Sequence, residues 1–247
     1  NPKSEDVLGV KCVPTVAEIP EEIDMAIFII PSTSVPAELE ACAKKGARAA
    51  IVISAGFREI GGEGVKLEAE IKRISDAYGM AVLGPNCLGL INSDPKLSLN
   101  ASFAGTIPKS GNIAFISQSG ALGTALLDYA QGENVGFSKF VSLGNKVDVS
   151  ELEILQYLKD DPNTDVIMMY LEDIGKGQEF IEVAREITGD IAKPKPILVV
   201  KSGRTAQGAK AASSHTGSLM GADEVYDAVF AQSGVMRMDS AEEMFDL

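Results

Sequence analysis

The stretch "NIAFISQSGALGTALLDYAQG" (residues 112–132) decides the fold class of this chain. Its first part, NIAFIS, is a short and mostly apolar run, which predicts a strand buried inside a sheet. The part that follows, GALGTALLDYAQG, predicts a helix. A strand that leads through a short turn into a helix is the repeating unit of a parallel sheet covered by helices. We therefore expect an α/β protein.

The same alternation continues to the end of the chain. Four further apolar runs predict strands: FVSLG (140–144), DVIMMYLE (165–172), KPILVVKSG (195–203) and VMRM (235–238). Helical stretches separate them, and one of these opens with the S-x-x-E capping box of Ser150 and Glu153. Five strands with crossover helices predict a flavodoxin-like, doubly wound domain, which we place at residues 101–247.

The first half alternates in the same way. Three apolar runs predict strands at DMAIFII (24–30), AAIVIS (49–54) and MAVLG (80–84). The stretches VPAELEACAKKG (35–46) and EGVKLEAEIKRISDAYG (63–79) have helical periodicity and close with glycines suited to a helix C-terminus. This βαβαβ pattern predicts a second parallel sheet.

A polar segment rich in Pro, Gly and Ser, LINSDPKLSLNASFAGTIPKSGN (90–112), interrupts the alternation between the halves. We interpret it as a segment that links the two domains or wraps between them, and place the end of the first domain at residue 100. The chain opens with "NPKSEDV", without a methionine, so we expect the first domain to be incomplete at its N-terminus.

Composition excludes several classes of protein. No apolar run approaches the ~20 residues that a membrane span needs, and no signal peptide is visible. The formal charge of −13, from 22 basic and 35 acidic side chains, disfavours nucleic acid as a partner. An anionic small ligand stays possible, because helix N-termini hold phosphate without net positive charge. The three cysteines are widely spaced and odd in number, which indicates reduced thiols in the cytoplasm.

Ligands of open α/β sheets bind beyond the carboxyl ends of the strands, so the turns that follow strands hold the candidate residues. In "SQSGALG", Ser117 ends a strand, and Ser119 and Gly120 lie where a helix begins. A helix start carries about +0.5 charge and unpaired N–H groups, which suits phosphate. The alternative is an ordinary N-cap serine followed by glycines for close packing.

Glu172 stands at the end of an otherwise apolar strand in "YLED". A carboxylate there could orient an imidazole through its ring N–H. The alternative is an acidic residue near the start of the next helix, and Asp173 competes for either role. Cys87, in "LGPNC", has no second histidine to activate it, so we interpret it as a packing or ligand-lining residue rather than a nucleophile.

The single histidine, His215, lies in a long Gly-, Ala- and Ser-rich loop, SGRTAQGAKAASSHTGSLMG (202–221). Long loops in compact domains are more often functional than filler. A lone histidine is usually a hydrogen-bonded or surface residue, but small neighbours would let this imidazole approach a ligand closely. Imidazole can accept and pass on a group near neutral pH.

Six motifs in this order closely resemble the NDP-forming acyl-CoA synthetases, and most of all the α part of the ADP-forming acetyl-CoA synthetases. They are ISAGF, LGPNCLGLIN, ISQSGALG, SLGNKVDV, KSGRT and SSHTGSL. The resemblance spans essentially the whole chain and extends to the succinyl-CoA synthetase α subunit. It implies a Rossmann-like CoA-binding domain followed by the flavodoxin-like domain. The implied reaction converts acyl-CoA, ADP and phosphate into free acid, CoA and ATP through a phosphohistidine.

By position, the resemblance makes His215 the phosphorylated residue and Glu172 the carboxylate that orients it. It places Ser117, Ser119 and Gly120 at the helix start that receives the phosphoryl group. The residues expected to line the CoA site, with Cys87 nearby, are Lys3, Pro31, Ser32 and Asn86. The resemblance implies no metal ion held by this chain.

The chain departs from the family pattern in two ways. The glycine-rich loop that the family uses against CoA after its first strand is absent. No ATP-grasp region is present either, so ADP or ATP with Mg²⁺ would bind on another chain or another part of the protein. We therefore expect a partner ATP-grasp subunit or domain and an oligomeric enzyme. The alternatives are the CoA-binding regulatory region of a protein lysine acetyltransferase and a non-enzymatic CoA sensor.

Overall fold

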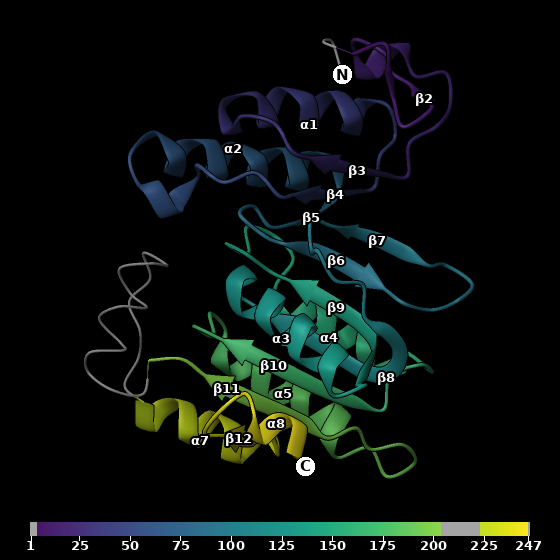
Figure 1. Cartoon of the computed structure of the whole chain (residues 1–247). Coiled ribbons are helices and arrows are strands. Elements are labelled where there is room, and N and C mark those ends of the chain that lie inside the picture. The colour runs from purple at the N-terminus through teal and green to yellow at the C-terminus, as the bar shows by residue number, and fades with distance from the viewer. Residues whose placement is uncertain (1–3, 204–222, 247) are drawn as a thin grey trace.

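The computed structural model describes residues 4–203 and 223–246, which form two halves stacked one on the other (Figure 1). The first half begins with a short antiparallel pair and a 3-10 turn: β1 (Asp6–Val7), β2 (Val10–Lys11) and η1 (Val16–Glu18). No helix of the described residues is both long and apolar enough to cross a membrane.

The sheet of the first half is parallel, with the order β3-β4-β5, as the βαβαβ pattern predicts. Its strands are β3 (Met25–Phe28), β4 (Ala49–Val52) and β5 (Ala81–Leu83). The connections are η2 (Ser32–Ser34), α1 (Val35–Lys44), η3 (Arg58–Ile60) and α2 (Glu63–Tyr78). Gly79 ends α2 in the left-handed conformation, so the glycine that the sequence places there is the helix C-cap.

The second half is built on a seven-stranded sheet with the order β12-β11-β10-β8-β9-β6-β7. Its parallel strands are β8 (Lys109–Ser117), β9 (Gly136–Ser142), β10 (Val166–Leu171), β11 (Ile197–Lys201) and β12 (Met236–Met238). Counted from β8, the first five positions read 5-4-3-1-2, which is the flavodoxin order. The prediction of a flavodoxin-like domain is therefore confirmed.

Helices cover both faces of this sheet: α3 (Gly120–Gly132), α4 (Glu151–Asp160), α5 (Gly177–Thr188), α7 (Asp223–Ser233) and α8 (Glu243–Asp246). Alternate residues of a strand point to opposite faces. In β8, Ala114 and Ile116 belong to one apolar cluster, shared with α4, α5 and α7. Phe115 between them packs with α3 and α8. Burial on both faces explains why the predicted strands are continuous apolar runs.

The linker interpretation of residues 90–112 is wrong. This segment contains β6 (Gly89–Asn92) and β7 (Leu99–Ser102), which pair antiparallel with each other. β6 also pairs antiparallel with β9, so the hairpin extends the sheet of the second half. The Pro, Gly and Ser residues lie largely in the connections around two short strands, and averaging the composition over the whole segment hid them. Figure 1 shows the hairpin between β5 and β9.

The two halves meet along a backbone seam, which we define as residues 82–86 against residues 143–149. The N–H groups of Asn145, Val147 and Val149 donate to the carbonyl oxygens of Pro85, Gly84 and Val82, at 2.8, 3.0 and 3.1 Å. A Cβ on Gly144 would lie 2.2 Å from the Pro85 oxygen, and Gly144 has φ +59. Only glycine meets both requirements, so this position sets how closely the halves approach.

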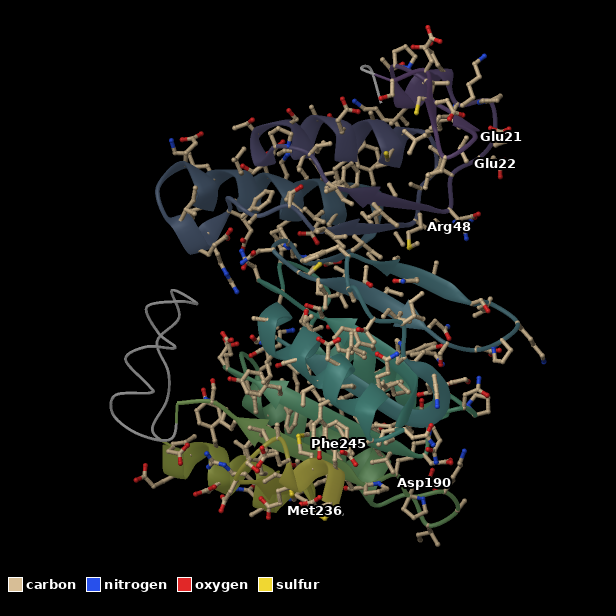
Figure 2. The ribbon with its side chains drawn as sticks, viewed as in Figure 1. Glu21, Glu22, Arg48, Asp190, Met236 and Phe245 are labelled. Atoms are coloured by element: carbon tan, nitrogen blue, oxygen red, sulfur yellow. The ribbon has the colours of Figure 1, made fainter. Side chains whose placement is uncertain are left out.

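The seam, and those predicted site residues that the structure describes, lie at or after the carboxyl ends of strands. Figure 2 labels Arg48 and Asp190, which precede β4 and β11 and lie on the right of the view, where strands begin. The turns after β4, β5, β8, β9 and β10 lie at the other end of the strands. This edge is where the sheet rule places a ligand.

Candidate functional site

A cleft of about 510 Å³ opens between the two halves. It is lined by four predicted site residues, Asn86, Ser119, Gly120 and Glu172, together with Cys87. Asn86 and Cys87 come from the turn after β5, Ser119 and Gly120 from the start of α3 after β8, and Glu172 from the turn after β10. The structure therefore brings into one hollow residues that the sequence places far apart.

The turn between β8 and α3 is shaped by its two serines. Ser119 is the N-cap of α3, and its Oγ accepts a hydrogen bond from the Leu122 N–H at 3.3 Å. Ser117 is fully buried, and its Oγ donates to the Ser119 carbonyl at 2.7 Å and accepts from the Ser119 N–H at 3.2 Å. Ser119 thus both caps the helix and lines the cleft, whereas Ser117 supports the turn from inside.

Gln118, between these serines, links the turn after β8 to the turn after β10. Its side-chain Oε1 accepts hydrogen bonds from the backbone N–H groups of Glu172 and Asp173, the latter at 2.9 Å. Its Nε2 donates to the Asp173 carbonyl at 3.0 Å and to the Asp173 carboxylate at 3.1 Å. The start of α3 and the turn that carries Glu172 are therefore held together.

Lys146 brings a positive charge to the same cleft. Its Nζ lies 2.8 Å from Asp173 Oδ1 and 3.1 Å from Oε2 of Glu151, the first residue of α4. Only 9% of the lysine side chain is exposed. The ammonium is thus fixed between two carboxylates rather than extended into solvent.

A second polar network joins the halves at the side of the cleft. Asn145 Nδ2 donates to Glu59 Oε2 and Glu68 Oε2, both at 2.7 Å. Nε of Arg58 lies 3.4 Å from Glu68 Oε1, and the guanidinium also donates to the Asn145 carbonyl. Asn86 Nδ2 donates to Asn145 Oδ1 at 3.4 Å. Arg58, Asn86 and Asn145 all line the cleft, so this network shapes its wall.

The two glutamates of this network differ in pKa. Burial raises the pKa of Glu68, and the hydrogen bond from Asn145 and the charge of Arg58 offset only part of that effect. Burial also raises the pKa of Glu59, but hydrogen bonds from Asn145 and from the backbone of Gly56 and Phe57 outweigh it and lower the pKa. The hydrogen bonds to Glu59 therefore favour its ionised form.

The thiol of Cys87 is not prepared for nucleophilic attack. It is 4% exposed and donates to the Val52 carbonyl at 3.4 Å. Burial raises the pKa of Cys87 to about 12, so the thiolate is scarce at neutral pH. These observations support its interpretation as a packing and cleft-lining residue.

Pro31 and Ser32 do not line the cleft, although they stand beside one of its turns. Pro31 is the N-cap of η2. Ser32 lies against the turn after β4, where a Cβ on Gly56 would come within 2.7 Å of its Oγ. Ala55 of that turn lines the cleft. Among the described residues proposed for CoA, Asn86 alone reaches this hollow.

Lys3 and His215 lie outside the described residues, so their predicted roles stay predictions. Within residues 4–203 and 223–246, no group of three or more His, Cys, Asp or Glu side chains is placed to hold a metal ion.

Sequence reasoning missed the four further residues that bring charged or amide side chains to the cleft: Arg58, Gln118, Asn145 and Lys146. Three of them lie inside motifs that the family resemblance singles out, ISQSGALG and SLGNKVDV, and Arg58 directly follows ISAGF. Their position in those motifs was the available signal. Their roles depend on partners up to 87 residues away along the chain, which the motifs alone do not identify.

Comparison with known proteins gives a consistent result along the chain. Residues 110–247 match the family model of the succinyl-CoA ligase like flavodoxin domain, and residues 1–93 match that of a CoA binding domain. The chain is 48% identical over 246 residues to the ADP-forming acetate–CoA ligase I of Archaeoglobus fulgidus, covering 100% of this chain and 35% of that protein. It is 47% identical over 236 residues to the α subunit of ADP-forming acetate–CoA ligase I of Pyrococcus furiosus, covering 96% of this chain and 50% of that subunit.

A solved structure is similar over the whole chain. The dinucleotide-forming acetyl-coenzyme A synthetase 1 of Ca. Korarchaeum cryptofilum, in complex with phosphate and ADP, superposes with a TM-score of 0.92 at 45% identity. The superposition covers 100% of this chain and 52% of that one. The chain thus spans between about a third and about half of the length of these relatives.

Proposed function

The chain belongs to the NDP-forming acyl-CoA synthetase family, as the α-type CoA-binding and succinyl-CoA ligase-like part of an ADP-forming acetyl-CoA synthetase, and from this premise we propose how it acts. The complete enzyme converts acyl-CoA, ADP and phosphate into free acid, CoA and ATP. This chain binds acyl-CoA and phosphate in the cleft between its halves. His215 then carries the phosphoryl group away from the cleft.

The chemistry requires an activated phosphate. An oxygen of inorganic phosphate attacks the thioester carbonyl, the carbon–sulfur bond breaks, and CoA leaves as a thiolate that takes up a proton. The product is an acyl phosphate. The His215 imidazole then attacks phosphorus, forming an N–P bond while the P–O bond to the acid breaks and the carboxylate leaves. In the last step a terminal oxygen of ADP displaces the imidazole and forms ATP.

The observation that carries the proposal is the composition of the cleft. Asn86 of the CoA-binding half lines the same hollow as Ser119 and Gly120 at the start of α3 and as Glu172. The helix start offers partial positive charge to phosphate. Glu172 is proposed to accept a hydrogen bond from the imidazole N–H and so to orient the ring.

The charged residues of the cleft bear on the binding of a phosphorylated imidazole. A phosphorylated imidazole carries close to two negative charges, and the helix dipole contributes only about 0.3 to 2 kcal/mol. Lys146 and Arg58 line the cleft, and both are paired with carboxylates, Lys146 with Asp173 and Glu151 and Arg58 with Glu68. They therefore limit the negative charge of the cleft rather than making it positive.

The remaining assignments follow from the same premise. Lys3, Pro31, Ser32 and Asn86 contact CoA, and Ser117 supports the phosphate turn. We place the boundary between the domains before β6 rather than at residue 100, because β6 and β7 pair within the sheet of the second half. ADP, ATP and Mg²⁺ bind on an ATP-grasp subunit or domain that completes an oligomeric enzyme. Free cysteines at positions 12, 42 and 87 suit a reducing compartment such as the cytoplasm.

The decisive experiment is mass spectrometry of the complete enzyme after mixing with acetyl-CoA and inorganic phosphate, without acid treatment because N–P bonds hydrolyse in acid. We expect one phosphoryl group, on His215. We also expect His215→Ala to abolish acetyl-CoA-dependent ATP formation while acetyl-CoA binding, measured by calorimetry, stays within about twofold of wild type because no CoA contact is removed.

Phosphorylation of a different residue would contradict the assignment of His215. An enzyme that binds acetyl-CoA but acquires no phosphoryl group, and forms no ATP, would instead point to a CoA-binding regulatory region.

A further inference from the structure

Asp173, the residue after Glu172, is held from two sides. Its carbonyl oxygen accepts hydrogen bonds from Gln118 Nε2 at 3.0 Å and from Lys146 Nζ at 3.2 Å. Its carboxylate Oδ1 accepts from Gln118 Nε2 at 3.1 Å and lies 2.8 Å from Lys146 Nζ. Backbone and side chain of Asp173 are therefore bound by the same two residues, which we call the Asp173 clamp.

The clamp reaches Glu172 through the backbone. Gln118 Oε1 accepts from the N–H groups of both Glu172 and Asp173. Gln118 is only 8% exposed, so water competes little for these bonds. The peptide that carries the Glu172 side chain is thus oriented by its neighbour and by the turn after β8.

Lys146 is itself held rigidly. Glu151, which is 2% exposed, fixes the ammonium from the start of α4. The backbone of Lys146 has φ +56, an uncommon conformation for a residue other than glycine. Such a conformation persists where the surroundings determine it, and it clusters at functional sites. The neighbouring Asn145 and Val147 hold the same turn in the seam between the halves.

We propose that Lys146 is a positioning residue for Glu172: through Asp173 it holds the Glu172 carboxylate in the place where it orients the phosphoryl-carrying imidazole. The inference rests on the proposed function, because it needs Glu172 in that role. It adds a link between the halves, since a lysine in the seam then controls a carboxylate at the end of β10.

The competing explanation is a lysine that only stabilises the fold. Removing one partner of a buried ion pair destabilises a protein whatever its function. The two explanations differ in kinetics and in pH dependence, so the test uses measurements that a loss of stability alone does not change.

The variants are Lys146→Met, which removes the charge and keeps much of the volume, and Lys146→Arg, which keeps the charge. Lys176→Met is the matched control, because Lys176 is an exposed lysine three residues after Asp173 that pairs only at the surface with Glu179, at 3.2 Å. Glu172→Gln provides the reference for complete loss of the carboxylate. All are made in the complete enzyme and assayed well below its unfolding temperature.

We expect Lys146→Met to slow single-turnover phosphorylation of His215 by about tenfold to a hundredfold, the usual cost of a misplaced reacting group. Binding of acetyl-CoA should stay within about twofold of wild type, because a mutation that acts only on the transition state leaves ground-state binding unchanged. Lys146→Arg should recover most of the rate, since a guanidinium can also bond both acids. Lys176→Met should behave as wild type.

The pH dependence gives an independent measurement. Lys146 Nζ lies 2.8 Å from the carboxylate of Asp173, the residue next to Glu172, and a positive charge there favours the ionised form of a neighbouring carboxyl group. The acid limb of the phosphorylation rate should therefore move to higher pH in Lys146→Met. Among the described residues, Lys201 and Tyr170 also interact electrostatically with Glu172 and Asp173 is next to it in the sequence, and all three are unchanged in this variant. Lys146→Arg keeps the charge and should leave the limb in place.

Hydrogen exchange of the Glu172 and Asp173 amides reports on the clamp without any activity. Faster exchange of both amides in Lys146→Met, and not in Lys176→Met, is expected. Wild-type exchange and wild-type phosphorylation in Lys146→Met would overturn the inference, even in an enzyme whose Glu172→Gln variant is slow. Normal phosphorylation in Glu172→Gln would instead refute the role proposed for Glu172, whatever Lys146→Met shows about the clamp.

Discussion

Glu172 and Asp173 follow the same strand but have different contacts. From the sequence either could orient an imidazole. The Asp173 carboxylate is engaged by Lys146 and Gln118, so it is committed to holding the turn. Both acids line the cleft, and the role of Glu172 in orienting the imidazole stays a proposal.

Another lysine, Lys201 at the end of β11, is buried, and burial disfavours its charged form. It is 2% exposed, its Nζ donates to the Ser202 carbonyl at 2.5 Å, and the ammonium lies 4.3 Å from the Tyr226 ring. Burial lowers the pKa of Lys201 from 10.5 to about 8, although Asp223, Asp173 and Glu172 oppose the change. The folded protein therefore releases this proton more readily than the unfolded chain does.

This difference predicts a pH dependence of stability. Below pH 8 both states carry the proton, and the full cost of the buried charge is present. Between about pH 8 and 10.5 the folded state loses the proton first, so the contribution of Lys201 to the free energy of unfolding rises with pH. One pKa unit corresponds to about 1.4 kcal/mol, which gives a rise of roughly 3 kcal/mol.

Denaturant unfolding at several pH values, compared between wild type and Lys201→Met, measures this rise. The stability of wild type relative to the variant should increase from pH 8 to 10.5. Lys176→Met serves as the control for removal of an exposed lysine. A difference between wild type and Lys201→Met that is constant across this range would contradict a lowered pKa.

Among the elements, α3 and α4 have comparable caps with different surroundings. Ser119 caps α3 and lines the cleft, whereas Ser150 caps α4 within a capping box with Glu153 and does not line it. Both helices follow a strand of the same sheet. Comparing Ser119 with Ser150 therefore separates the effect of an N-cap on stability from the effect of the α3 start on ligand binding.

We expect Ser119→Ala and Ser150→Ala each to lower the free energy of unfolding by about 1 kcal/mol, the usual loss for a removed N-cap. Ser119→Ala alone should also raise the KM for phosphate, by about tenfold if one hydrogen bond to a charged oxygen is lost. Chemical denaturation and the phosphate dependence of ATP formation give the two values. Equal effects of both variants on the KM for phosphate would show that the α3 start does not contact this substrate.

At the scale of the whole molecule, the seam aligns the CoA-binding half with the phosphate turn. Residues 143–149 run along residues 82–86 through three backbone hydrogen bonds, and Val82 N–H also donates to Asp148 Oδ2 at 2.9 Å. The cleft is built from both halves, so its geometry depends on this contact. A small displacement of the seam should therefore affect binding and chemistry together.

Gly144→Ala tests this dependence. The added Cβ would meet the Pro85 oxygen at 2.2 Å, and φ +59 is unfavourable for alanine. We expect the free energy of unfolding to fall by about 1–3 kcal/mol or more, and kcat/KM for acetyl-CoA to fall by about tenfold or more because the halves separate. Gly105→Ala is the control, since nothing lies within 4 Å of its Cβ position. Unchanged kcat/KM in Gly144→Ala would mean that the cleft tolerates a shifted seam.

Local patterns in the sequence predicted the five parallel strands of the flavodoxin-like half and the helices between them, and the doubly wound class implied the 2-1-3-4-5 strand order. Apolar runs, helical periodicity and caps such as Ser150 and Glu153 depend on residues close together in the chain. The same patterns located the turns after strands, where Asn86, Ser119 and Glu172 stand. The turn residues also carried the family resemblance, which local physics alone does not supply.

Tertiary structure alone decided which of these turns lie side by side and which residues line the cleft. It assigned β6 and β7 to the second sheet, tied Asp173 to Gln118 and Lys146, and joined Arg58 to Asn145. Each of these contacts joins residues far apart in the chain, and their hydrogen bonds and ion pairs leave no periodic pattern in the sequence. The cleft therefore forms only when the two halves pack together, although the sequence locates each of the turns that line it.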